Sequence, residues 1–197
     1  MEPLLILVKN MVSKKDIRKS ILEKRNQIVQ KKWEENSRRI YEKVVTHPFF
    51  LDAEVIYCYV DYRNEVCTRD IIINAWKSDK KVAVPRIQGD TMTFHYITDW
   101  KDLKEGFKGI LEPLCMPEAL DDTPLIIMPG VAFDRDCNRI GYGKGFYDKF
   151  LEMHPRCTTI ALSFELQLVE KVPTQDNDIC PQILITEENI YECTTAK

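Results

Sequence analysis

The chain has 197 residues, which suits one domain with a core large enough to fold without disulfides or a structural metal. Its 44% hydrophobic and 30% charged residues are typical of a soluble globular protein and argue against a disordered chain. The net charge of −3 argues against wholesale nucleic-acid binding, so we expect no nucleic-acid partner.

The first residues hold an apolar run of six residues, too short to span a membrane and without the basic start of a signal peptide. We therefore expect no membrane partner. Residues 1–12 are expected to be a disordered extension, or translation to begin at Met11. Seven cysteines without a CxxC pair indicate free thiols in a reducing cytosol, and hence a cytoplasmic protein. The three histidines share no ligand spacing with them, which argues against zinc.

Two helices are predicted within residues 13–46. Ser13 and Asp16 resemble a capping box for a helix over 14–29, and a second helix over 33–45 should end before Pro48. The first helix has an apolar stripe and a neighbouring basic stripe: Ile17, Ile21 and Ile28, then Lys14, Arg18 and Arg25. Residues 14–43 hold eleven Lys and Arg against five Asp and Glu, a local +6 on a chain that is otherwise at −9. This indicates either an anion-attracting arm or a solvated helix face.

The rest of the chain alternates strands with helices. Thr68 is placed to cap a helix over 69–79, and another helix is predicted over 144–153. Strands are predicted at 54–60, 81–87, 92–97, 124–130, 158–164 and 183–186. This order is typical of an α/β sandwich with a largely parallel sheet. Ligands of such sheets bind beyond the carboxyl ends of the strands, where YVDYRNE, LIIMPG and SFE lie.

The segment RIGYGKGFYD, at 139–148, holds three of the seven glycines at alternate positions ahead of a predicted helix. Glycines let a ligand approach the backbone, and amides at a helix N-terminus favour an anion. Arg139 and Lys144 would add positive charge. The segment is neither a Walker A motif, because glycine follows the lysine, nor a GxGxxG fingerprint. Spacing alone leaves a phosphate site and a structural turn as equal alternatives.

The longer string MPGVAFDRDCNRIGYGKGFYDKFL, at 128–151, resembles the signature of the 5-formyltetrahydrofolate cyclo-ligase (methenyltetrahydrofolate synthetase) family. That signature has a PG turn, FD, NR and then GxGxGYYD. Weaker pieces follow in the family's order from about Lys14: KKDIR, NEVCT, VPR, GILEP and VPTQDND. The resemblance implies one domain over 1–197, with N-terminal helices ahead of a three-layer, Rossmann-like sandwich. Its central sheet would be largely parallel and the fold NagB/RpiA/CoA-transferase-like.

The resemblance also implies the reaction. 5-Formyltetrahydrofolate would be cyclised to 5,10-methenyltetrahydrofolate with ATP and Mg²⁺, releasing ADP and phosphate, in one-carbon folate metabolism. The γ-phosphoryl group would pass to the formyl oxygen, making it a good leaving group for attack by N10. The protein's task would be positioning and charge stabilisation. The substrates are then small molecules, a polyglutamylated folate among them, whose tail the basic residues 14–43 could meet. We expect a monomer.

The site residues are those that match the family's motifs. ATP binding is implied for Lys14, Arg18, Arg139, Ile140, Gly141, Tyr142, Gly143, Lys144, Gly145, Phe146 and Tyr147, with Lys144 and Arg139 catalytic. Folate binding is implied for Val60, Glu65, Tyr142, Gly143, Lys144, Gly145 and Phe146, with Glu65 accepting the pterin's N–H groups. Mg²⁺ binding is implied for Asp148 and Asp178, with Asp176 as an alternative to the latter. Without the resemblance, Lys14 and Arg18 would be a solvated face, and the aromatic residues core. Met128, Pro129 and Phe133 are expected near the same crevice from their position in the sequence.

Three positions depart from the family's pattern. Cys137 stands where glycine is common, and we expect a local backbone change with Asn138 tolerating the left-handed turn. Phe146 lacks the hydroxyl of the usual tyrosine, and Gln182 replaces an aspartate that could support the metal. Two alternatives stay open. A non-catalytic folate or nucleotide sensor is opposed by the intact Lys144, Asp148 and Glu65, and a sugar-phosphate isomerase by the full 128–151 string.

Overall fold

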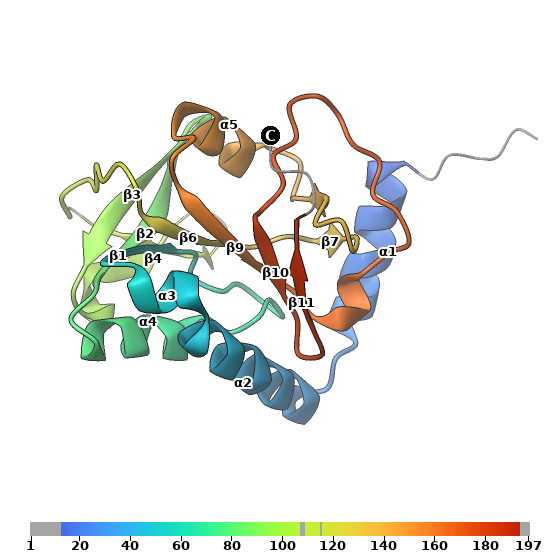
Figure 1. Cartoon of the computed structure of the whole chain (residues 1–197), viewed down its shortest axis with the longest axis horizontal. Coiled ribbons are helices and arrows are strands. Elements are labelled where there is room, and N and C mark those ends of the chain that lie inside the picture. Colours follow the sequence, from blue (N-terminus) through green and yellow to red (C-terminus); the bar gives the residue numbers. More distant parts are fainter. Residues whose placement is uncertain (1–12, 107–108, 115, 194–197) are drawn as a thin grey trace, which may run out of the picture.

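The computed structural model describes residues 13–106, 109–114 and 116–193, so the expected extension at 1–12 lies outside it. At its centre is a seven-stranded sheet in the order β11-β10-β9-β6-β1-β2-β3 (Figure 1). The strands are β1 Val55–Cys58, β2 Lys81–Gln88, β3 Thr91–Ile97, β6 Leu125–Met128, β9 Thr158–Leu162, β10 Ile183–Ile185 and β11 Ile190–Glu192. Strands β10, β9, β6, β1 and β2 are parallel, and β11 and β3 are antiparallel edges. The predicted parallel sheet is confirmed, and β11 is an additional strand.

Helices cover both faces of the sheet. The helices are α1 Lys14–Asn26, α2 Gln30–Thr46, α3 Pro48–Asp52, α4 Arg69–Lys77 and α5 Phe146–Met153. Alternating side chains of β1 point to opposite faces: Ile56 and Cys58 join the core under α2, α3 and α4, and Tyr57 joins the core under α5. The layers are visible in Figure 1, with α5 on the face opposite α2 to α4. The predicted α/β sandwich is therefore confirmed.

Shorter elements complete the chain. Strands β4 (Leu103–Glu105) and β5 (Leu111–Pro113) form one antiparallel ladder, and β7 (Ala132–Phe133) and β8 (Arg139–Ile140) form another. Within the described ranges, 3₁₀ turns include Trp100–Asp102 and Glu165–Gln167. Among the described residues, no helix is long and apolar enough to cross a membrane.

Helix boundaries differ from the sequence prediction: α1 ends at Asn26 and not at 29, α2 begins at Gln30 and not at 33, and α4 ends at Lys77 and not at 79. Pro48 does not merely end a helix but begins α3, because its missing N–H and fixed φ suit a first helical position. The His47 imidazole caps α3 by accepting the backbone N–H of Phe49. Thr68 precedes α4 as predicted, but its hydroxyl donates to the backbone of Tyr59 at 2.8 Å and to Asp61 instead of capping the helix. Thr68 thus fixes the loop that leaves β1.

The strand order has a switch point between β1 and β6. The chain passes from β1 through α4 to β2 on one side, and from β6 to β9 and β10 on the other. Loops leaving the carboxyl ends of β1 and β6 therefore diverge, which is where open α/β sheets bind ligands. Helix α1 lies beside this edge, near β7 (Figure 1).

Candidate active site

Glu65 lies in the loop that follows β1 and is only 6% exposed. Its carboxylate accepts the backbone N–H of Tyr62 at 2.9 Å and the hydroxyl of Tyr142. Its carbonyl accepts the indole N–H of Trp33 at 2.7 Å. Burial raises the pKa of the Glu65 carboxyl, while the Tyr142 hydrogen bond and the charge of Arg25 oppose the rise. Contacts from α2 and from the glycine-rich segment thus fix this acid.

The glycine-rich segment joins β8, a strand that was not predicted, to α5, so it lies directly ahead of a helix as predicted. The helix begins at Phe146, two residues later than predicted, because Gly145 takes a left-handed φ of 65°. Gly143 has a φ of 101°, which side chains rarely adopt. Lys144, between these glycines, is exposed, and it has no hydrogen bond or ion pair within the described part of the chain. It is free to meet an incoming anion.

The basic stripe of α1 makes three contacts with the site. Lys14 Nζ lies 2.5 Å from Asp178 Oδ2, and Arg18 Nε donates to the carbonyl of Gly141 at 2.8 Å. Arg25 Nη2 donates to the Tyr142 hydroxyl at 2.7 Å. The apolar stripe holds the helix in place, because Ile17 and Ile21 pack in a cluster with Val131, Ala132, Ile140 and Val172. Both predicted stripes therefore make contacts, except that Ile28 lies beyond the end of α1 and packs against the core under α2 to α4.

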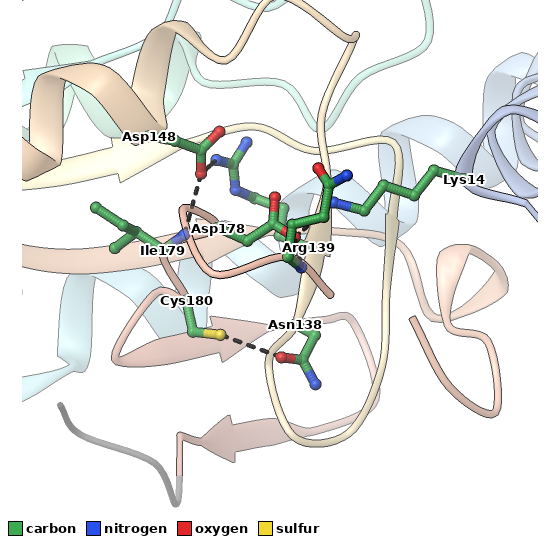
Figure 2. A network of polar contacts seen from close by, with 8 residues as sticks. Lys14, Asn138, Arg139, Asp148, Asp178, Ile179 and Cys180 are labelled. Atoms are coloured by element: carbon green, nitrogen blue, oxygen red, sulfur yellow. Dashed lines mark hydrogen bonds and ion pairs between the residues drawn. The ribbon is translucent and has the colours of Figure 1, made fainter. Parts of the chain in front are cut away.

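Asp148 and Asp178 lie close together, because Ile179, the residue after Asp178, donates its backbone N–H to Asp148 (Figure 2). Asp148 Oδ1 accepts from Arg139 Nη2 at 2.8 Å and from the N–H of Ile179 at 3.2 Å. Asp178 is paired with Lys14, as noted, whereas Asp176 is exposed. Each predicted metal ligand is therefore neutralised by a predicted ATP-binding cation. No cluster of three or more metal-ligating side chains exists among the residues described, so Mg²⁺ binding stays a prediction.

Asp134 shapes the turn that leads into the glycine-rich segment and is 1% exposed. Its carboxylate accepts the backbone N–H groups of Asn138 and Val172, each at 2.9 Å, and the side-chain amide of Asn138. Within this turn Cys137 has a φ of 65°. The expectation that Asn138 would take the left-handed position is therefore wrong, because Cys137 itself adopts it. Cys180 donates to the Asn138 amide oxygen at 3.3 Å (Figure 2).

Several predicted neighbours of the site are core residues. Met128 and Phe133 are fully buried in the core under α5, so the expectation that they line a crevice is wrong. Val60, in the loop two residues after β1 ends, is 9% exposed, and Phe146 packs half-buried against the same core as Phe133. Gln182 bonds reciprocally with Thr159, which ties β9 to the start of β10.

The sequence model of the 5-formyltetrahydrofolate cyclo-ligase family matches residues 10–187. The chain belongs to this family. It is 28% identical over 176 residues to the 5-formyltetrahydrofolate cyclo-ligase of Mus musculus, covering 79% of this chain and 81% of that protein. It is 26% identical over 183 residues to the cyclo-ligase of Escherichia coli K12, covering 87% and 99%.

Solved structures agree with this membership. The 5,10-methenyltetrahydrofolate synthetase of Aquifex aeolicus has a TM-score of 0.83 at 25% identity, covering 93% of this chain and 94% of that one. The fold is also that of the synthetase of Mycoplasma pneumoniae, with a TM-score of 0.72 at 20% identity over 88% and 98%. The cyclo-ligase membership confirms the expectation of a ligase of folate metabolism. The NagB/RpiA/CoA-transferase-like assignment stays a prediction.

Two residues that contact or shape the candidate site were given no role from the sequence. Arg25 was placed on the basic stripe but given no role, although position i+11 returns to within about 20° of position i on a helix. Asp134 belongs to the recognised FD pair, but the sequence does not show that its carboxylate reaches Val172. The helical spacing of Arg25 from Lys14 could have indicated its contact with the site. The contact of Asp134 with Val172 could not be predicted, because the two residues are far apart in the sequence.

Proposed function

We propose that the protein catalyses the ATP- and Mg²⁺-dependent cyclisation of 5-formyltetrahydrofolate to 5,10-methenyltetrahydrofolate, with release of ADP and phosphate. One observation carries the proposal: the basic stripe of α1, the glycine-rich segment and two aspartates meet at one place in a chain of the cyclo-ligase family. A cluster of cations around permissive backbone is what a transferring phosphoryl group requires.

Lys144 and Arg139 would oppose the charge that develops on the γ-phosphoryl group as it passes to the formyl oxygen. Arg139 is 8% exposed and already oriented by Asp148, whereas Lys144 is exposed and unpaired within the described residues. A buried guanidinium gives fixed bidentate geometry, and a mobile ammonium follows the transferring group as a point charge. Once the formyl oxygen is phosphorylated, N10 attacks the formyl carbon and phosphate leaves.

Asp148 and Asp178 fit a magnesium ion by their chemistry, because carboxylate oxygens are ligands that Mg²⁺ accepts in small number beside phosphate oxygens. When bound, the ion would offset the negative charge of the triphosphate. Each aspartate is now held by a cation, Lys14 or Arg139. If Asp148 and Asp178 held the ion, Lys14 and Arg139 would be available to bind phosphate oxygens.

The test is the growth of the methenyl product's ultraviolet absorbance when 5-formyltetrahydrofolate, ATP and Mg²⁺ are all present. Omission of any one, or chelation of the metal, should abolish it. Lys144→Ala should lower kcat by about 100-fold or more, because it removes a charge that acts on the transition state. Lys149→Ala, an exposed lysine on α5, is the matched control and should retain activity.

Unchanged turnover in Lys144→Ala would contradict the assignment of the loop. Tight folate binding without any turnover in the wild type would favour the sensor. Sedimentation of the purified protein tests the expected monomer, and fractionation of the native cell tests the expected cytoplasmic location. Both are still predictions.

A further inference from the structure

Arg25 is an unusual residue of the site because it is charged and only 2% exposed. Its Nη2 donates to the Tyr142 hydroxyl, but its Nε and Nη1 have no acceptor among the described residues. A buried donor without a partner is costly, and a buried charge more so. Such a group, next to the predicted folate-binding Glu65, indicates that an acceptor arrives with a ligand.

The Tyr142 hydroxyl connects these two charged residues. It accepts from Arg25 Nη2 and donates to Glu65 Oε1. The other carboxylate oxygen, Oε2, accepts the N–H of Tyr62 at 2.9 Å. One small group therefore presents an acceptor to the guanidinium and a donor to the carboxylate, side by side.

A 2-amino-4-oxopteridine has the same pattern along one edge. Its ring N3–H and 2-amino groups are donors that suit a carboxylate, and the neighbouring 4-oxo group is an acceptor that suits a guanidinium. A hydroxyl that bridges Glu65 and Arg25 matches the N3–H and 4-oxo pair of this edge. A guanidinium distinguishes the 4-oxo ring from a 4-amino ring, because it can only donate and the 4-amino group is itself a donor.

We propose that Arg25 binds the 4-oxo group of the folate's pterin beside Glu65, and that the Tyr142 hydroxyl occupies this place until the folate arrives. The inference rests on the proposed function and deepens it, because it assigns a substrate-binding and specificity role to Arg25. Tyr142 is able to move away from Glu65 and Arg25. It is 49% exposed, and it lies between Gly141 and Gly143, which allow the backbone a wide range of conformations.

The experiment measures binding of 5-formyltetrahydrofolate and of its 4-amino analogue by isothermal titration calorimetry. In Arg25→Met, the Kd of the 4-oxo ligand should rise about 10- to 100-fold, the range of a lost hydrogen bond to a charged group. The Kd of the 4-amino ligand should change by less than about threefold, so that discrimination falls. ATP affinity should stay as in the wild type. Arg38→Met, an exposed arginine on α2 paired with Glu42, is the matched control.

Circular dichroism shows whether Arg25→Met is folded, and replacing a buried, incompletely paired charge by an apolar side chain is often neutral for stability. If that variant does not fold, Arg25→Gln provides the same comparison, since it removes the charge and keeps a polar side chain. An unchanged ratio of the two Kd values in a folded Arg25 variant that still cyclises the folate would overturn the inference alone. A wild type that binds neither pteridine would overturn the proposed function as well.

Tyr142→Phe tests the second half of the proposal. Without the hydroxyl there is no internal occupant to displace, so the folate should bind about three- to tenfold more tightly. Weaker folate binding would show that the hydroxyl contacts the ligand, and would overturn its role as an occupant of the site.

Discussion

Asp134→Ala should destabilise the protein more than the removal of a single small side chain suggests. The carboxylate is 1% exposed and accepts three backbone N–H groups, those of Asn138 and Val172 at 2.9 Å each and that of the exposed Asp136 at 3.1 Å. The alanine variant leaves the two less exposed donors, those of Asn138 and Val172, without their acceptor, and each buried unpaired donor costs about 1–3 kcal/mol. Taking the middle of that range gives a loss of about 4 kcal/mol in the free energy of unfolding. For a chain of this length that lowers Tm by about 8–16 °C.

The assay is thermal unfolding followed by circular dichroism, with Asp136→Ala as the matched control because that aspartate is exposed in the same turn. We also expect the KM for ATP to rise, since the turn leads directly into Arg139. A Tm within about 2 °C of the wild type would refute the reasoning, because one hydrogen bond left unpaired already predicts more. A loss of stability equal to that of Asp136→Ala would show that the turn, and not the carboxylate, is responsible.

Two further predictions concern Glu65 and Gly130. Burial raises the folded-state pKa of Glu65, so its contribution to stability is full below the unfolded pKa and is lost as pH rises through the folded pKa. The Tm of Glu65→Gln minus that of the wild type should therefore increase as the pH is raised from 4 to 7. Folate turnover should be lost in this variant. A difference in Tm that does not change with pH would contradict the reasoning. Gly130→Ala places a Cβ 2.3 Å from Cζ of the buried Phe133, which predicts a loss of about 1–3 kcal/mol in urea unfolding. Gly106→Ala, whose Cβ meets only the flexible side chain of Glu112, should lose much less, and equal losses would argue against overpacking.

The sheet could be predicted from sequence because its strands are short apolar runs buried on both faces, such as Leu125–Met128. The ladders β4–β5 and β7–β8 were not predicted. Residues such as Ala132 and Arg139 carry little strand preference, and they pair only because the turn between them is fixed by Asp134. Strand β11 likewise depends on β10 as its partner.

The site was partly predictable for a similar reason. The family motif marks residues close together in sequence, and the structure brings Lys14, Asp148 and Asp178 into one network. The motif does not show which of these side chains are already bonded to another residue of the chain. The pairing of each aspartate with a cation, and the Tyr142 hydroxyl between Arg25 and Glu65, depend on contacts more than 70 residues apart or between different elements.

Helix α1 carries Lys14, Arg18 and Arg25, and it is attached through an apolar cluster separate from the two main cores. A helix of 13 residues is marginal in water by itself, so its helicity depends on this attachment. Undocking it would break all three basic contacts at once, and any ligand that holds one of those cations must oppose undocking. Binding of a ligand at the site should therefore slow the exchange of the α1 amide protons with solvent, while the exchange of the central strands is unaffected.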